Sequence, residues 1–172
     1  MRRWAPRLDL VSAGDLERFE ERHIADSLRL APLIDDLPEG PCIDVGSGAG
    51  LPGIPLAIAR PERHWRLLEP RTRRAGFLEE VVRSLGLACE VLPLTAEVAA
   101  EDDRLRGVHV LATARALAQP VAAARLIEPL VHPDGIAALF VGPGAELPAR
   151  AALWTAGVAI IRTKPPEQGI SG

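Results

Sequence analysis

The sequence predicts an α/β protein with a mostly parallel sheet of six or seven strands and helices on both faces. Short apolar runs alternate with longer amphipathic segments, which is the pattern of strand–helix–strand units. A glycine-rich loop follows the first apolar run, at the end of a strand where such sheets bind ligands. The 172 residues are enough for one domain with a sizeable core. We therefore expect a single domain over 1–172, with a helical segment at 1–38 and an α/β core at 39–172.

Each expected element has its own local signal. Ser12 can cap a first helix over 15–34. Prolines are tolerated in the first turn of a helix, so Pro52 and Pro55 are compatible with a helix that runs to residue 60. Gly86 closes an amphipathic helix over 73–85. Two further helices are expected at 119–131 and 145–156. Apolar runs predict the strands, at 42–45, 64–68, 89–92, 108–112, 136–141 and 158–162.

The composition is that of a soluble globular protein, with 48% apolar and 25% charged residues. No stretch approaches 18 consecutive apolar residues, and the first residues lack the pattern of a signal peptide, so we expect a cytoplasmic protein with no membrane contact. Cys42 and Cys89 form no CxxC pair and are interpreted as core thiols. His64, His109 and His132 have no ligand-like spacing, so no metal site is predicted.

The charge distribution gives a mixed signal about nucleic acid. The net charge of −3 argues weakly against a general nucleic-acid binder. Residues 60–83 are nevertheless locally basic by three charges, all of them from arginine. Arg71, Arg73 and Arg74 follow an expected strand end closely enough to lie at the rim of a pocket. The alternative is that this run is a solvated helix face.

The glycine loop has the spacing Gly46-x-Gly48-x-Gly50, with Asp44 just before it. A dinucleotide fingerprint has its third glycine one place later, which counts against a nicotinamide-binding oxidoreductase. The tighter spacing after an acidic residue is typical of class I, Rossmann-like methyltransferases that use S-adenosylmethionine. The glycines would let the backbone approach the methionine part of that cofactor. Glu69, 19 residues after Gly50, would accept hydrogen bonds from both ribose hydroxyls. The alternative is an unoccupied turn with a solvated glutamate.

Three runs in this order carry a more specific resemblance: RHIADS at 22–27, DVGSGAGLPGIPL at 44–56 and ARA at 114–116. With them the chain resembles the RsmG family, also called glucose-inhibited division protein B, over roughly residues 4–145. These bacterial enzymes methylate a guanine N7 in small-subunit ribosomal RNA. The resemblance implies the same activity here, S-adenosylmethionine as cofactor, and ribosomal RNA or the small ribosomal subunit as partner. We expect a monomer.

The resemblance also implies site residues. It places cofactor contacts at Gly46 and Leu51 in the loop, at Ala96 and Glu97 after the third strand, near the adenine, and at Arg115. Arg115 is the residue we expect beside the methyl group and the target base, as the catalytic residue. Its position after an apolar run agrees with this role, and the alternative is a surface arginine in a helix-entry loop.

Some family features are absent or ambiguous. The family has a lysine where this chain has Val141 and tends to have an arginine where it has Thr95. A further helical segment usually precedes Trp4, and a seventh strand is expected beyond the last residues. His23 and Asp26 belong to a family motif, but they could equally be a structural link between the first helix and the glycine loop. These departures leave the cofactor side nearly intact but affect the RNA side. The first hypothesis is therefore an RsmG-like methyltransferase, and the alternative is a divergent relative that binds the cofactor but methylates another substrate or is inactive.

Overall fold

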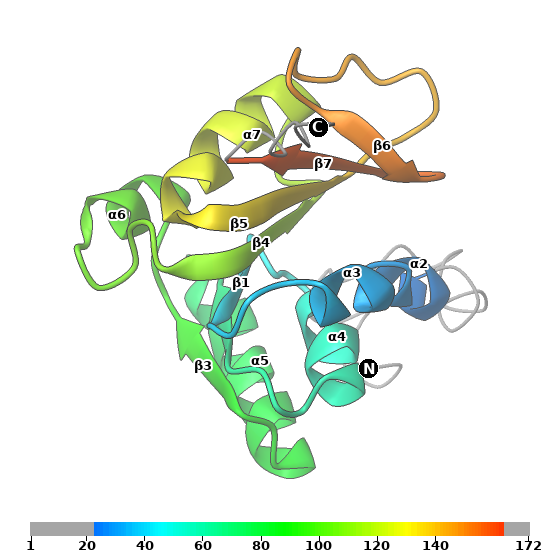
Figure 1. The fold of residues 1–172 in the computed structure, drawn as a ribbon. Helices are drawn as coiled ribbons and strands as arrows, with labels where there is room; N and C mark the ends of the chain where they lie inside the picture. Colours follow the sequence, from blue (N-terminus) through cyan, green and yellow to red (C-terminus); the bar gives the residue numbers. More distant parts are fainter. Residues whose placement is uncertain (1–22, 164–172) are drawn as a thin grey trace.

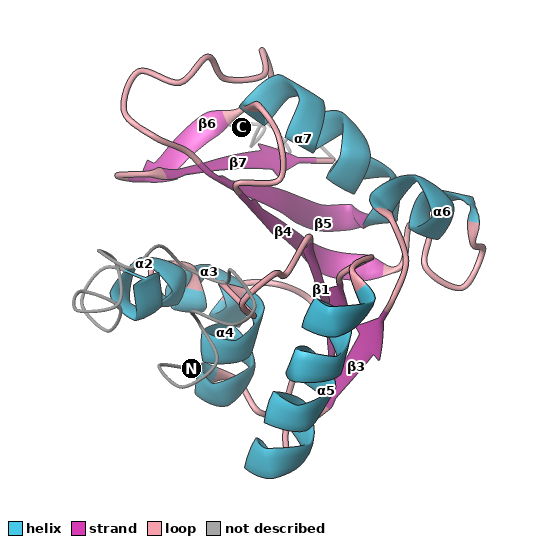
Figure 2. Ribbon diagram, turned by 180° about the vertical axis from the view of Figure 1, so that it is seen from behind, coloured by secondary structure: helices cyan, strands magenta, loops and turns pink. Residues whose placement is uncertain are grey.

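The computed structural model describes residues 23–163, which form one seven-stranded sheet with helices on both faces (Figures 1 and 2). Ser12 and the first part of the expected helix lie outside the described residues. The strands are β1 (Cys42–Val45), β2 (Trp65–Leu68), β3 (Cys89–Leu92), β4 (His109–Arg115), β5 (Val131–Phe140), β6 (Ala152–Thr155) and β7 (Val158–Arg162). The helices are α2 (Ala25–Leu28), α3 (Ala31–Asp35), α4 (Gly53–Ala59), α5 (Thr72–Leu85), α6 (Ala96–Glu101) and α7 (Pro120–Ile127), followed by the 3₁₀ turn η3 (Glu128–Leu130).

The strand order is β3-β2-β1-β4-β5-β7-β6. The first five strands in this order are parallel, whereas β7 pairs antiparallel with both β5 and β6. The sheet is therefore mostly parallel, as expected, and has seven strands. The order reverses between β1 and β4, and ligands of such sheets bind at this switch point, outside the carboxyl ends of the strands.

The core consists of two apolar layers that follow the alternation of side chains along the strands. Ile43 and Val45 of β1 pack in one cluster with side chains of α6 and α7. Cys42, one residue earlier, points to the opposite face and packs with α3 and α4. The helices α6 and α7 thus cover one face of the sheet, and α3, α4 and α5 cover the other (Figure 2). Cys42 is buried and Cys89 is half-buried, and both thiols are free.

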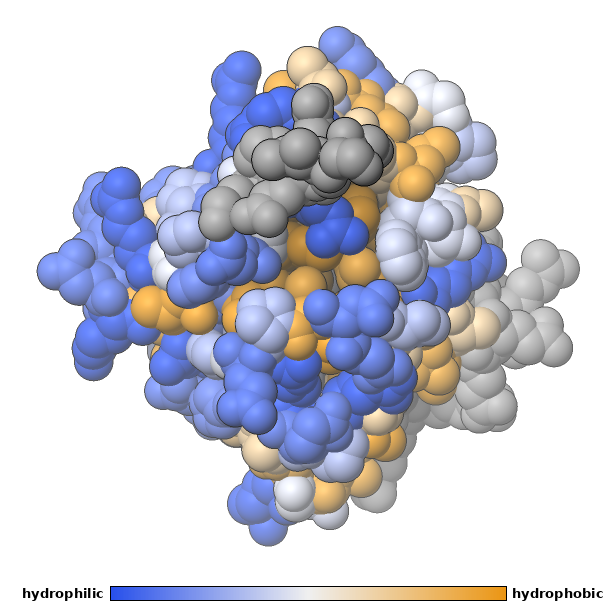
Figure 3. Space-filling model, viewed as in Figure 1, coloured by the Kyte–Doolittle hydropathy of each residue, from blue (hydrophilic) through white to orange (hydrophobic). Residues whose placement is uncertain are grey.

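The surface seen in Figure 3 is mostly hydrophilic, with hydrophobic residues in small separated areas. Within residues 23–163, the large apolar side chains that are exposed come from several different elements, namely Leu28, Ile58, Leu85, Val98, Leu153 and Trp154. No helix in this part of the chain is long and apolar enough to cross a membrane.

Several predicted elements agree with the structure to within one or two residues, and two predicted helices are wrong. The strand at 42–45 and the helix closed by Gly86 are confirmed, and Gly86 takes the left-handed conformation at φ 61°. The described part of the helix expected at 15–34 is instead two short helices, because Pro32, in the first turn of the second helix, has no amide to donate to the turn before it. The helix expected at 145–156 is wrong, since residues 152–155 form the edge strand β6.

Smaller differences also have local causes. The helix expected at 119–131 ends at Ile127, and a 3₁₀ turn that contains Pro129 follows it. The strand expected at 108–112 continues to Arg115, so that Arg115 is the last residue of β4 rather than part of the loop after it. The helix α6 was not predicted, although Thr95 caps it by accepting a hydrogen bond from the amide of Val98.

Candidate active site

The predicted site residues lie at the carboxyl ends of four adjacent strands. The glycine loop follows β1, Glu69 follows β2, Ala96 and Glu97 begin the helix after β3, and Arg115 ends β4. Because these strands are parallel neighbours, the four positions share one edge of the sheet. The sequence predicted this common edge, which includes the switch point between β1 and β4.

The three glycines of the loop all have a positive φ, but their surroundings differ. The values are 72° at Gly46, 53° at Gly48 and 84° at Gly50. A Cβ on Gly46 would lie 2.8 Å from Leu117 Cδ1, and one on Gly50 would lie 2.5 Å from Ile54 Cγ1. At Gly48 the nearest atoms would be 3.8 Å away. Gly46 and Gly50 therefore allow close packing of the loop, whereas a Cβ at Gly48 would make only ordinary van der Waals contacts, so glycine serves there for its positive φ.

Glu69 is buried, with only 4% of its surface exposed, and its carboxylate holds the glycine loop. Its Oε2 accepts a hydrogen bond from the Gly48 amide at 3.0 Å, and its Oε1 accepts one from the Arg71 amide at 2.9 Å. Each carboxylate oxygen has a second lone pair, so the group can still accept from ribose hydroxyls. This acceptor at the edge of the glycine loop fits the ribose of S-adenosylmethionine.

Asp44 anchors the far end of the same loop, a role that sequence reasoning missed. Its Oδ2 accepts from the Gly53 amide at 3.1 Å, and its Oδ1 accepts from the Thr113 hydroxyl at 2.8 Å. A Cβ on Gly53 would lie 2.9 Å from Asp44 Oδ2, so only glycine allows this approach. Burial raises the pKa of Asp44 to about 6, although these hydrogen bonds and the charge of Arg115 act in the opposite direction.

Replacing Asp44 with asparagine should change the pH dependence of stability. Because the pKa rises from about 3.9 in the unfolded chain to about 6 in the folded protein, ionisation of Asp44 favours unfolding as the pH rises between these values. The wild type should lose up to about 3 kcal/mol of unfolding free energy from this group across that window, and Asp44→Asn should not. Urea unfolding of both proteins from pH 4 to pH 8 measures the difference. A difference that stays constant over this range would contradict the argument.

The remaining predicted cofactor residues are less enclosed. Ala96 is buried in the core, whereas Glu97 is exposed, and hydrogen bonds from its own amide and from Thr95 lower its pKa. Leu51 is half-buried and lines an apolar hollow of about 340 Å³ between α2, α4 and α5. Thr95, at the position where the family tends to have arginine, is the cap of α6.

Arg115 is held from two sides at the end of β4. One guanidinium nitrogen, Nη2, lies 2.5 Å from His23 Nδ1, and the group lies over the Phe140 ring at 5.8 Å from its centroid. The next residue, Ala116, has a φ of 52°, which is uncommon for a residue other than glycine. Such local strain clusters at functional sites. His23 thus links the first helical segment to β4, whereas the sequence left open a link to the glycine loop.

A cavity of about 650 Å³ opens beside Arg115. Asp26 and Arg29 line it on the side of α2, and Phe140, Val141 and Gly157 line it on the side of β5 and β7, among other residues. Its volume suits a nucleobase with part of its ribose. Val141, where the family has lysine, gives this wall no charge.

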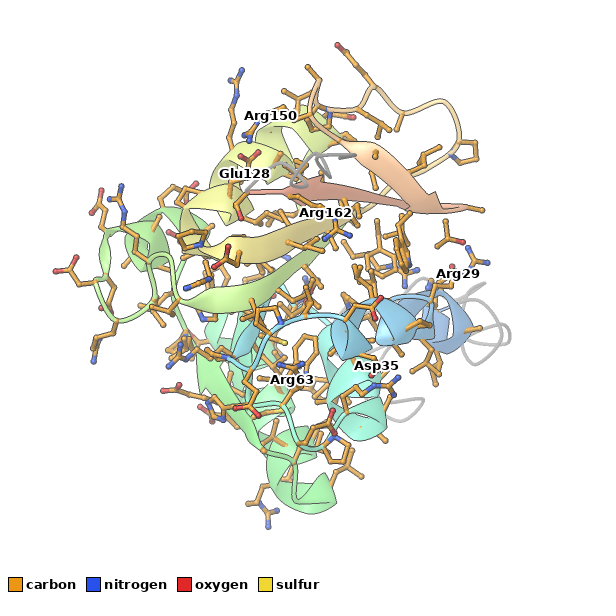
Figure 4. All side chains as sticks on the ribbon, viewed as in Figure 1. Arg29, Asp35, Arg63, Glu128, Arg150 and Arg162 are labelled. Carbon is orange, nitrogen blue, oxygen red and sulfur yellow. The ribbon has the colours of Figure 1, made fainter. Side chains whose placement is uncertain are left out.

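The arginine-rich window is largely structural. Arg60 makes a bidentate pair with Asp35, and Arg63 donates to the carbonyls of Ile34, Leu37 and Pro38 at the end of α3 (Figure 4). Arg83 pairs with a glutamate on its own helix. The arginines nearest the glycine loop differ from these paired arginines in their surroundings. Arg71 and Arg73 are exposed, and Arg74 lies beside Gly48.

His109 and His132 are strand residues, as predicted, whereas His64 lies directly before β2 in neither a strand nor a turn. His109 lies buried in β4, where its Nδ1 donates to the Leu130 carbonyl at 2.9 Å and its Nε2 accepts from Arg66 at 3.0 Å. Burial lowers its pKa to about 4, so the ring is neutral. Within the described chain, no group of three His, Cys, Asp or Glu residues could hold a metal ion.

The doubly wound sheet, with this glycine loop at its switch point, defines a Rossmann-like class I methyltransferase fold. A protein of known structure from Corynebacterium glutamicum superposes on this chain with a TM-score of 0.67 and 13% sequence identity. The superposition covers 97% of this chain and 89% of that protein. A putative methyltransferase from Escherichia coli has a TM-score of 0.59, covering 80% and 81% at 16% identity. The chain belongs to the GidB family, rRNA small subunit methyltransferase G, whose profile matches residues 1–151.

The chain is also similar to curated proteins with the name of this family. These relatives are longer than the chain. Ribosomal RNA small subunit methyltransferase G of Acidiphilium cryptum is 42% identical over 158 residues, which cover 88% of this chain and 69% of the relative. Its counterpart in Corynebacterium jeikeium is 48% identical over 128 residues, covering 73% and 55%. The alignment with the relative from Sorangium cellulosum covers 63% of that protein. The chain thus spans between about half and two thirds of the relatives' length.

Proposed function

We propose that this chain is a single-domain, S-adenosylmethionine-dependent methyltransferase that modifies guanine N7 in the RNA of the small ribosomal subunit. The observation that carries this proposal is the arrangement around Arg115 at the switch point. On one side, toward β1 and β2, are the glycine loop and the Glu69 carboxylate, which suit the cofactor. On the other side is a cavity of about 650 Å³, which suits the target nucleotide.

Methyl transfer to guanine N7 requires few catalytic groups from the protein. When bound, the cofactor supplies a methyl group attached to a positively charged sulfonium sulfur. In an in-line displacement this sulfur would leave as a neutral thioether, which is a good leaving group. Guanine N7 attacks with its own lone pair, so no general base is needed, and the described site offers no paired carboxylates for that purpose. Catalysis then rests on orientation and on the placement of charge.

Arg115 would orient the base. Arginine pairs well with the O6 and N7 edge of guanine, and a donor aimed at O6 leaves N7 free to react. The contacts with His23 and Phe140 fix the guanidinium before the substrate arrives, so less freedom is lost on binding. Gly46, Gly48, Gly50, Leu51, Glu69, Ala96 and Glu97 complete the cofactor side of this proposal.

Two measurements test the proposal. Calorimetry with S-adenosylmethionine, S-adenosylhomocysteine and NAD should show binding of the first two, and binding of NAD alone would refute it. Small ribosomal subunits that lack the modification should then accept radiolabel from the cofactor, and the label should co-migrate with 7-methylguanosine after digestion. Cofactor binding without transfer to these subunits would mean that the chain acts on another substrate or is inactive.

A further inference from the structure

The first helical segment of the described chain contacts the substrate cavity through residues at three-residue intervals. His23 contacts Arg115 at the end of β4. Asp26 pairs with Arg29 Nη2 at 3.1 Å, and both side chains line the cavity. Residues three apart on a helical turn face the same side. This side of the segment is therefore one wall of the cavity.

Arg29 reaches from that wall to the opposite one. Its Nη1 donates a hydrogen bond of 2.6 Å to the carbonyl of Ala156, in the turn between β6 and β7 (Figure 4). The next residue of the turn, Gly157, accepts a hydrogen bond of 2.9 Å from the amide of Val141. Val141 and Gly157 both line the cavity. One side chain thus connects α2, through the turn, to the loop after β5.

The position of this contact in the chain makes it informative. The family match ends at residue 151, so the β6–β7 hairpin lies beyond it. The same wall contains the uncharged side chain of Val141. The hairpin lines this side of the cavity through Gly157 and Val158, and the hydrogen bond from Arg29 ties it to the end of α2.

We propose that Arg29 is a positioning residue that sets the shape of the substrate cavity by holding the β6–β7 turn against α2. It acts on the substrate through the turn and Val141, and it does not contact the reacting atoms. The planar guanidinium fixes two partners in set directions, the Asp26 carboxylate and the Ala156 carbonyl, which a lysine ammonium on its flexible stem does less well.

Amide hydrogen exchange tests the contact without any need for activity. Arg29→Ala should raise exchange at the Val141 amide about tenfold, because the turn that accepts its hydrogen bond loses its tie to α2. Arg83→Ala is the matched control, since Arg83 also pairs with a carboxylate three residues away, on α5, and should leave this amide unchanged. Equal exchange at Val141 in the wild type and Arg29→Ala would overturn the proposal.

Methyl transfer tests whether the position of the turn affects catalysis. This measurement rests on the proposed function. Arg29→Ala should lower kcat/KM for small subunits about tenfold or more and leave the dissociation constant of S-adenosylmethionine within about twofold. Arg29→Lys should fall between the wild type and Arg29→Ala. Faster exchange with unchanged kcat/KM would overturn the positioning role. Absence of transfer in the wild type would refute the proposed function instead, while the exchange result would still decide whether Arg29 holds the turn.

Discussion

Replacement of Arg115 by alanine should lower methyl transfer about 100-fold or more while the protein stays folded. The guanidinium lies between the proposed cofactor side and the cavity, held by His23 and Phe140, and the shorter side chain would leave the target base without a fixed donor. Stability should change by only about 1 kcal/mol, because Arg115 is half-buried at a strand end. Single-turnover transfer to small subunits measures the rate, and thermal unfolding measures the stability.

Two further variants test the cause of the loss of methyl transfer in Arg115→Ala. Arg115→Lys keeps the charge but not the planar fork, so it should recover only part of the rate if orientation is the main contribution. Arg125→Ala removes an exposed arginine from α7 and should leave the rate unchanged. An Arg115→Ala rate close to that of the wild type would remove Arg115 from the site. Full activity in Arg115→Lys would mean that charge alone matters.

Apart from α6, the order of elements from β1 to β4 was predictable because glycines and prolines mark their ends. Gly86 ends α5 in a left-handed conformation, and the strand at 89–92 was predicted with its final bounds. The common edge of the site residues then follows from parallel pairing alone. The resemblance to the family adds what this argument lacks, the identity of the base and the choice of Arg115.

The last third of the chain was harder because its local preferences and its tertiary contacts disagree. The alanine-rich run at 145–156 suits a helix, but Pro148 interrupts it, and Ala152, Leu153 and Thr155 pair with β7 instead. Gly157, at a φ of 79°, makes the tight turn that allows this hairpin. The cavity wall that Arg29 contacts was therefore invisible in the sequence pattern.

The roles of individual charges were also out of reach of sequence patterns. Nothing in the spacing distinguishes Arg60 and Arg63, which cap α3, from Arg71 and Arg73, which remain exposed near the loop. Asp44 belongs to the pattern before the glycines, but its hydrogen bond with Thr113 depends on the neighbouring strand β4. Long-range partners decide these roles, and a single sequence does not show them.

Replacement of Glu69 by glutamine should weaken binding of S-adenosylmethionine about 10- to 100-fold, as measured by calorimetry. The two carboxylate oxygens each accept a backbone amide, one from Gly48 and one from Arg71. A glutamine has only one oxygen, so its NH₂ group would face one of these donors and leave it unpaired in a buried place. The glycine loop would lose its anchor, and the ribose hydroxyls would lose a charged acceptor.

The control for this variant is Glu79→Gln, which changes an exposed glutamate on α5 and should leave cofactor affinity unchanged. Methionine, which lacks a ribose, separates the loop contribution from the ribose contribution. If Glu69 acts on the ribose, Glu69→Gln should weaken binding of S-adenosylhomocysteine by a larger factor than binding of methionine. Exchange at the Gly48 amide reports the loss of the loop anchor separately. Unchanged cofactor affinity in Glu69→Gln would contradict the placement of the ribose at the end of β2 and would require a different orientation of the cofactor across the switch point.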